Sequence, residues 1–304
     1  MTPYLRWACL VCAAGIASAA ETVVGPGLSE ANKERVELDS QSDSTQWYNG
    51  SPEETQLSSS AAHVKQGSAA LKFANVVDHT KGEKAYPVGW PRAGTDLAKM
   101  KLTDWSAFDL FECWIYTETS RDHLPNAPLT VGFYHSGPKR STSVPLNTVK
   151  KDQWVKFAIP VSQIEEPQDV QRIQFSISEA NYRHGDRIDF YIDDPVLTRY
   201  VQPAIASFEL DRKIMYADET YVVGRFTLAG HQGLETTRVQ LTVGPADRPV
   251  TSATTVATRT GEITAKLSTS PPAGLCEARL DLRDTQGRLL DRSVAQFRVL
   301  GGPF

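Results

Sequence analysis

The sequence predicts an all-β protein built from two β-sandwiches. Apolar and polar residues alternate in many short segments, which are bounded by Gly, Pro, Asn and Asp. No long segment shows the apolar period of an amphipathic helix that would compete with this pattern. At roughly 150 residues per domain, the 304 residues are enough for two modules. We therefore expect a jelly-roll β-sandwich followed by an immunoglobulin-like β-sandwich.

Residues 1–20 are expected to be a signal peptide. One basic side chain, Arg6, precedes an apolar run from Trp7 to Ile16, and small residues stand before Glu21. No later stretch approaches the ~20 apolar residues of a membrane span. We expect a protein secreted to the periplasm or the cell exterior, in which residues 21–34 form a polar leader.

Charge and composition exclude other classes of protein. With 40% hydrophobic and 22% charged residues, the chain has the composition of a globular protein and not of a disordered or collagen-like one. The formal net charge of −4 leaves no basic excess to neutralise phosphates, so nucleic acid is not an expected partner.

Residues 35–200 form the first expected domain. Its strands are predicted by alternating segments at 36–38, 70–73, 111–115, 131–133, 155–159, 173–177 and 188–192. Within one of them, if Phe111 and Ile115 face the core, Trp114 and Tyr116 face outward.

Residues 201–304 form the second expected domain. All tryptophans after the signal peptide lie before Tyr200, and a Thr-, Val-, Arg- and Leu-rich stretch follows it. Strands are predicted at 204–210, 221–228, 237–243, 254–259, 262–267, 276–282 and 293–300. About seven strands in ~100 residues are typical of an immunoglobulin-like sandwich. The two cysteines of the mature chain, Cys113 and Cys276, fall in different domains, so two buried free thiols are favoured over a disulfide.

The first domain also resembles a known family. Its motifs, in chain order, are VELDSQSDSTQW (36–47), VKQGSAALKF (64–73), LTDWSAFDLFECWIYTE (102–118), WVKFAIPVSQI (154–164), VQRIQFSIS (170–178) and DRIDFYIDDPVL (186–197). This order is similar to that of galactose-binding-domain-like jelly rolls, the carbohydrate-binding modules attached to bacterial glycoside hydrolases and polysaccharide lyases. The resemblance implies a polysaccharide or other glycan as partner. Because this fold hosts unrelated functions, the function has to be argued from the site.

The same resemblance implies a structural Ca²⁺ ion. The positions that match the family's ligands are Asp39, the turn at residues 65–68 that contains Gly67, and Asp193. Carboxylates combined with backbone carbonyls suit calcium, which takes about six to eight oxygen ligands. The alternative is that Asp39 caps a turn and that Asp193 or Asp194 faces solvent.

Exposed aromatic residues are the candidate ligand-binding groups. Trp114 beside Tyr116 would form a platform for a sugar ring, unless a loop covers this face. A Pro- and Gly-containing loop at residues 85–96 carries Trp90 and Arg92, and Trp90 either packs on the sheet or binds a ligand. The loop at residues 179–184 could converge on the same edge, and its candidate residues are Tyr182 and Arg183, joined by Tyr134 and His135 from a nearby strand.

No catalytic motif is evident in the sequence. The histidines are scattered without metal-ligand spacing, Gly-x-Ser-x-Gly is absent, and adjacent carboxylates in a strand point to opposite faces. We expect a non-catalytic glycan-binding protein whose second domain is a spacer or docking module. One alternative is an accessory part of a glycoside hydrolase or polysaccharide lyase whose catalytic domain is absent or separately encoded, and which would be the partner enzyme. The other is an adhesion or envelope scaffold.

Overall fold

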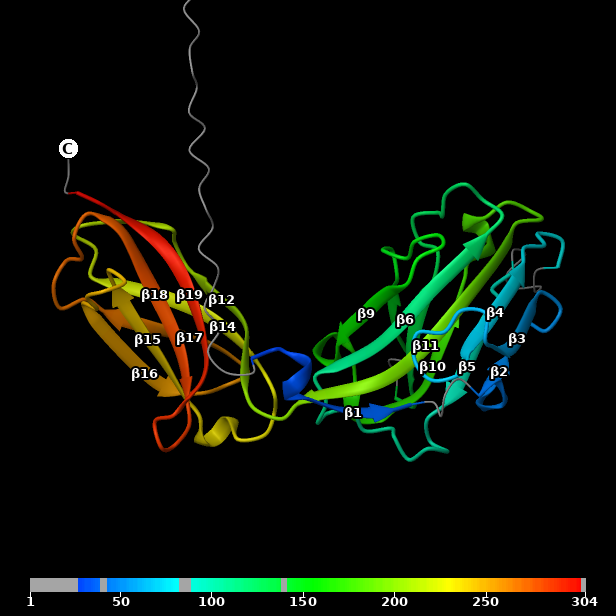
Figure 1. The fold of residues 1–304 in the computed structure, drawn as a ribbon, viewed down its shortest axis with the longest axis horizontal. Coiled ribbons are helices and arrows are strands. Elements are labelled where there is room, and N and C mark those ends of the chain that lie inside the picture. Colours follow the sequence, from blue (N-terminus) through cyan, green and yellow to red (C-terminus); the bar gives the residue numbers. More distant parts are fainter. Residues whose placement is uncertain (1–26, 39–42, 82–88, 138–140, 302–304) are drawn as a thin grey trace, which may run out of the picture.

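The computed structural model describes residues 27–38, 43–81, 89–137 and 141–301, and it confirms the all-β class (Figure 1). The helices among these residues are single 3₁₀ turns: η1 (Glu30–Asn32), η2 (Ser44–Gln46), η3 (Val161–Gln163), η4 (Pro167–Asp169), η5 (Glu179–Asn181) and η6 (Leu234–Thr236). None of the described helices has the length and apolar character needed to span a bilayer. The expected signal peptide and residues 21–26 of the expected leader lie outside the described residues. The rest of that leader is ordered: residues 30–32 form η1, and residues 33 and 34 begin a strand of the first domain.

A six-stranded sheet forms one layer of the first domain. Its strands are β1 (Lys33–Glu37), β3 (Thr55–Ser60), β4 (Ala70–Val76), β6 (Leu110–Thr119), β9 (Val155–Pro160) and β11 (Arg187–Tyr200). They run in the order β3-β4-β11-β6-β9, and β1 pairs with the C-terminal half of β11. All of these pairings are antiparallel.

A five-stranded sheet forms the second layer. Its strands are β2 (Trp47–Asn49), β5 (Arg92–Asp96), β7 (Thr130–His135), β8 (Ser141–Pro145) and β10 (Val170–Ser176). They are antiparallel in the order β2-β5-β10-β7-β8, so β10 is the central strand.

The core of the first domain lies between these two sheets. The rings of Trp105, Phe111 and Phe133 contact one another there, at centroid distances of 5.3 to 5.9 Å. Strand β10 contributes Ile173 and Phe175, both fully buried. Because side chains alternate along a strand, the residues between and before these two face away from the core. This alternation positions the candidate site described below.

The second domain has its own core between a three-stranded and a five-stranded sheet. The three-stranded sheet has the order β12-β14-β17, and the five-stranded sheet has the order β13-β19-β18-β15-β16. The strands are β12 (Ala204–Leu210), β13 (Ile214–Tyr216), β14 (Tyr221–Ala229), β15 (Arg238–Gly244), β16 (Thr251–Val256), β17 (Thr260–Lys266), β18 (Gly274–Arg283) and β19 (Leu289–Leu300). Their inward residues are buried; Phe226, Leu241 and Phe297, for example, are each 3% exposed or less.

A buried aspartate of the first domain bonds groups of the second. Asp109 is 4% exposed, and its Oδ2 accepts a hydrogen bond from the backbone N–H of Tyr200. Its Oδ1 accepts from the backbone N–H of Gly230 at 2.9 Å and from Nη2 of Arg259 at 3.1 Å. A buried carboxylate needs such partners to offset its desolvation. Asp109 therefore joins the end of β11 to two turns of the second sandwich.

Most predicted strands are present, with some differences. The predicted segment 254–259 is shifted relative to β16, which is Thr251–Val256. The prediction of a loop at residues 85–96 is wrong for its C-terminal part, because Arg92–Asp96 forms β5. Residues 85–88 of the predicted loop lie outside the described residues. Strands β2, β3, β8 and β13 were not predicted, since they are short or polar. Cys113 and Cys276 are buried free thiols, as predicted.

Candidate functional site

The five-stranded sheet of the first domain has a hollow on its outer face, which points away from the core. Its volume is about 600 Å³, and it is lined by Tyr48, Gly50, Trp90, Arg92, Tyr134, Arg172 and Gln174. We call it the sheet-face hollow. It combines two phenol rings, an indole, two guanidinium groups and an amide, contributed by strands β2, β5, β7 and β10 and the segments that flank them.

Glycines in the sheet make room for the two tyrosine rings. Across the strands, Tyr48 pairs with Gly94, and Gln174 lies opposite both Gly94 and Gly132. A Cβ atom on Gly94 would collide with the phenol of Tyr48, and one on Gly132 would lie 3.0 Å from Cε2 of Tyr134. Each ring therefore covers a glycine, a close approach to the backbone that a side chain there would obstruct.

Gln174 links the two tyrosines. The hydroxyl of Tyr48 donates to Oε1 of Gln174 at 2.9 Å, and Nε2 of Gln174 donates to the hydroxyl of Tyr134, also at 2.9 Å. Gln174 is only 6% exposed, so both of its polar groups are satisfied beneath the rings. Burial raises the pKa of Tyr48 above its usual value, against the opposing effect of the nearby Arg172. Tyr48 thus remains a neutral hydrogen-bonding group at physiological pH.

Arg172 lies between the rings. Its guanidinium carbon is 4.0 Å from the centroid of Tyr134 and 5.8 Å from that of Tyr48, which is cation–π geometry. Its Nε is buried and has no hydrogen-bond partner among the described residues. The pairing of β10 with β7 shifts register between Val170 and Arg172, and such bulges re-aim side chains next to functional sites.

Trp90 forms the rim of the sheet-face hollow and is 45% exposed. Its backbone carbonyl accepts hydrogen bonds from Oγ of Ser51 at 3.2 Å and from Nη1 of Arg92 at 3.3 Å. The preceding Gly89 donates its N–H to Oε2 of Glu179 at 3.0 Å. These hydrogen bonds hold the backbone of Gly89 and Trp90 and so fix the position from which the exposed indole projects.

A second hollow continues the same face. It measures about 770 Å³ and shares Tyr48, Tyr134 and Arg172 with the sheet-face hollow. Its other lining residues are Asp96, Ala98, Lys99, His135, Ser136, Gly137 and Gln171. Because they share three lining residues, the two hollows adjoin on one face of the sheet.

Trp114 and Tyr116 lie elsewhere, on β6 of the six-stranded sheet. The residues at 61–69 cover them: Nζ of Lys65 stands 4.2 Å from the ring centroid of Trp114, and the ring of His63 stacks on Tyr116 at 4.0 Å. Nε2 of His63 also lies 2.9 Å from Oε1 of Glu118. The covering loop that sequence analysis left open is therefore present, and the faces of these rings are occupied by protein.

Tyr182 and Arg183 do not line the sheet-face hollow either. Tyr182 is 4% exposed, and its hydroxyl donates to the carbonyl of Pro128 at 2.6 Å, so it has no ring surface to offer a sugar. Arg183 is exposed in the turn after η5, where its backbone N–H bonds Asp186. Of the candidate ligand-binding residues, the structure brings Trp90, Arg92 and Tyr134 together in the sheet-face hollow.

Besides Gly50, sequence analysis missed three residues that bring a ring or a polar side chain to the sheet-face hollow: Tyr48, Arg172 and Gln174. A signal for the latter two was available, because the alternation that places Ile173 and Phe175 in the core turns Arg172 and Gln174 outward. Tyr48 stands on a strand too short to show an alternation.

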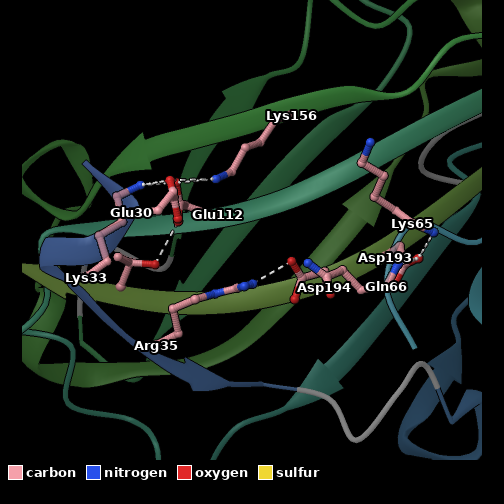
Figure 2. Close-up of polar contacts among 10 residues, drawn as sticks. Glu30, Lys33, Arg35, Lys65, Gln66, Glu112, Lys156, Asp193 and Asp194 are labelled. Atoms are coloured by element: carbon pink, nitrogen blue, oxygen red, sulfur yellow. Dashed lines mark hydrogen bonds and ion pairs between the residues drawn. The ribbon is translucent and has the colours of Figure 1, made fainter. Parts of the chain in front are cut away.

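The expected calcium ligands are only partly described. Asp39 lies outside the described residues. Asp193 is 2% exposed, and its Oδ2 accepts the backbone N–H of Lys65 at 2.6 Å and that of Gln66 at 3.0 Å (Figure 2). Gly67 follows with φ of +67°, the left-handed conformation that closes this turn. Where it meets Asp193, the turn thus presents N–H donors and not the carbonyl ligands that calcium needs. The described residues do not by themselves fit the ion, and calcium binding stays a prediction.

The other polar cluster of the six-stranded sheet is structural. Glu112 is 3% exposed and accepts hydrogen bonds from Nζ of Lys33 at 3.1 Å and Oγ1 of Thr198 at 2.8 Å, with Nζ of Lys156 also at 3.1 Å (Figure 2). Burial alone would raise the pKa of Glu112, but its three partners outweigh burial and hold the pKa below its usual range. The cluster ties β1 to β6, β9 and β11. No group of three or more His, Cys, Asp or Glu residues suited to a metal ion is found in the described part of the chain.

Comparisons with known proteins give a limited likeness. No family model matches the sequence, and no curated protein does. Similar solved structures include the glycoside hydrolase domain of Endo-D from Streptococcus pneumoniae R6, with 10% identity, a TM-score of 0.28, and coverage of 83% of this chain and 37% of that one. A β-glucuronidase from Ruminococcus gnavus has 9% identity and a TM-score of 0.30, and the match covers 90% of this chain and 46% of that one. A β-glucuronidase from Parabacteroides merdae has 10% identity and a TM-score of 0.27, with 73% and 28% covered. The chain spans less than half of each of these structures, and likeness at this level assigns it no activity.

Proposed function

We propose that this protein is exported and binds a glycan in the sheet-face hollow without cleaving it. The observation that supports this most strongly is the pairing of an exposed indole, Trp90, with a row of polar groups that are already positioned by one another. Sugar rings have apolar C–H faces and polar hydroxyl edges, so they need both kinds of group in one place.

The aromatic part of the site is accessible. Trp90 is 45% exposed and Tyr48 is 36% exposed, and both line the same hollow. A large aromatic side chain that stays in water loses the free energy of burial, which a stacked sugar ring would recover. By contrast, the remaining described tryptophans are at least partly buried, and Trp105 is fully buried.

The polar part of the site is preorganised. Gln174 is held by Tyr48 and Tyr134, and the Tyr134 hydroxyl, which accepts from Gln174, can donate its own proton to a ligand. Rigid groups lose little conformational freedom on binding, which favours affinity. Hydroxyl and amide groups of this kind fix the orientation of a sugar beside a stacking aromatic.

The test is binding of the mature full-length protein to a panel of soluble neutral and acidic polysaccharides, by affinity electrophoresis and isothermal titration calorimetry. We expect binding to at least one polymer, weakened about tenfold or more in Trp90→Ala because the stacking surface is lost. Tyr216→Ala is the matched control, since Tyr216 is a 52% exposed aromatic residue of the second domain, and it should leave binding unchanged. Absence of binding across the panel would refute the proposal.

The non-catalytic part is tested separately. The protein is incubated with each bound polymer, and new reducing ends and unsaturated products are measured. We expect neither above a buffer control. Release of either product at a rate that rises with protein concentration would show that the chain is an enzyme.

A further inference from the structure

The described lining of the sheet-face hollow has more positively than negatively charged side chains. Two of its described lining residues are arginines, Arg92 and Arg172, and none is a carboxylate. The chain as a whole has a formal net charge of −4. A local excess of guanidinium groups on an acidic protein favours an anionic ligand through complementarity of charge.

Arg172 is the arginine of the hollow whose charge has no acidic partner among the described residues. Among the described residues it contacts two tyrosine rings and forms no ion pair. The nearest acidic residue in the strand register is Asp96, directly opposite on β5. The carboxylate of Asp96 instead accepts the backbone N–H of Ala98 at 3.0 Å. Arg172 is thus a half-buried cation without a counter-ion in the described structure.

The position of Arg172 restricts how it can bind. The rings of Tyr134 and Tyr48 flank the guanidinium, and its Nε is buried and has no hydrogen-bond partner among the described residues. A guanidinium that stacks on aromatic rings keeps its donors in one plane, and this planar fork matches the two oxygens of a carboxylate. Charge-assisted pairs of this type are roughly twice as strong as hydrogen bonds between neutral groups.

We infer that the glycan is acidic and that Arg172 binds the carboxylate of a uronic acid unit while the ring of that unit or of its neighbour stacks on Trp90. This inference rests on the glycan-binding function proposed above and names the class of glycan. Among the described lining residues of the adjoining hollow, the ammonium of Lys99 offsets the carboxylate of Asp96, so these residues present no net negative charge to a second acidic unit.

The experiment compares acidic polymers with their own neutral forms. Polygalacturonate, polymannuronate and polyguluronate are each titrated into the full-length protein before and after reduction of their carboxyl groups to primary alcohols. Reduction removes the charge and keeps the sugar linkage. We expect at least one polymer to bind about tenfold to a hundredfold more tightly than its reduced form.

Variants assign the effect to Arg172. Arg172→Gln should abolish the difference between the acidic polymer and its reduced form. Arg172→Lys should keep part of it, because the charge remains and the planar fork is lost. The matched control is Arg225→Gln, at an exposed arginine of the second domain that pairs with Glu262, and it should change nothing. Circular dichroism and the unfolding midpoint show that each variant is folded.

The possible outcomes separate this inference from the proposed function. Equal binding of acidic and reduced polymers, or preference for the reduced form, overturns the acidic assignment and leaves glycan binding intact. A sulfated galactan is included, and tighter binding to it than to every uronan also overturns the carboxylate assignment. An undiminished preference for the acid in Arg172→Gln overturns the role of Arg172. No binding to any polymer refutes the proposed function itself.

Discussion

The guanidinium of Arg172 stacks over the ring of Tyr134 at 4.0 Å from its centroid. The two side chains come from neighbouring strands and are directly opposite in the register. The hydroxyl of the same tyrosine accepts a hydrogen bond from Gln174. Tyr134 therefore positions Arg172 through its ring and, through Gln174, also Tyr48. Substitutions at Tyr134 should separate these two roles.

Replacing Tyr134 tests the stacking. Tyr134→Phe keeps the ring beneath Arg172 and loses the hydrogen bond from Gln174, so we expect glycan affinity to fall by less than about tenfold. Tyr134→Ala removes the ring as well, which frees Arg172, and affinity should fall by tenfold or more. Calorimetric titration of both variants with one bound polymer measures the difference. If alanine and phenylalanine have the same effect, stacking of Arg172 does not contribute.

Gly94→Ala tests the close approach of Tyr48 to the sheet. The added methyl group would collide with the phenol, so the ring must move away from Gln174. We expect the free energy of unfolding to fall by about 1–3 kcal/mol and glycan binding to weaken. Gly132→Ala is the matched comparison, because its Cβ would meet Tyr134 at 3.0 Å and needs only a small adjustment. Urea unfolding that ranks Gly132→Ala as the more damaging change would contradict this account.

Glu112 should make stability fall in acid. Its pKa is held below the usual value of 4.5, so its contribution to stability is full above that value and is lost as the pH falls through the lower, folded-state pKa. Glu112→Gln should destabilise the protein at pH 7 by about 3 kcal/mol, because buried ammonium partners lose their counter-charge.

The measurement for Glu112 is urea unfolding of both proteins from about pH 3 to pH 7. The deficit of Glu112→Gln relative to the original protein should shrink as the pH falls. Glu262→Gln, at an exposed glutamate, is the control and should show a small deficit at every pH. A deficit for Glu112→Gln that does not change with pH would be inconsistent with the lowered pKa.

Glu54 should have the opposite dependence. Burial and the nearby carboxylate of Glu179 raise the pKa of Glu54 to about 7, and a Cβ on Gly89 would collide with both carboxylates. The unfolded chain ionises this group near pH 4.5. Its contribution to stability is therefore full below that pH and is lost as the pH rises through about 7.

A glutamine side chain does not ionise, so Glu54→Gln should remove this pH-dependent loss of stability. Relative to the original protein, the variant should therefore gain stability as the pH rises from about 5 to about 8. Because Gly89 precedes Trp90, glycan affinity of the original protein should also weaken over this range and that of Glu54→Gln should not. Thermal unfolding and titration at several pH values measure both. Glu53→Gln, at the exposed neighbouring residue, is the control. Parallel curves for the original protein and Glu54→Gln would count against the prediction.

The sequence predicted the fold class because burial imposes a period of two on strands such as β10, where Ile173 and Phe175 alternate with outward residues. It did not predict β5, whose residues Arg92–Asp96 include a glycine and three polar side chains. That strand is specified by pairing with β2 and β10, which are distant in the chain. Local pattern alone does not contain such pairings.

The candidate site was predicted in part for the same reason. The structure leaves Trp90 exposed, and its role in binding stays a prediction. The same sequence signal at Trp114 does not lead to an open face, because Lys65 and His63 from a distant loop cover Trp114 and Tyr116. The contact of Arg172 with Tyr134 and the fit of Tyr48 over Gly94 depend on the register of four strands. Register depends on long-range packing, so a single sequence does not reveal which outward residues meet.

The most direct test of the central claim is a crystal structure of the full-length protein with an oligosaccharide of the tightest-binding polymer. We predict a sugar ring against the indole of Trp90 and a carboxylate within hydrogen-bond distance of the Arg172 guanidinium, on the face of the five-stranded sheet. An oligosaccharide bound over Trp114 on the six-stranded sheet, or on the second domain, with the sheet-face hollow empty, would contradict the account.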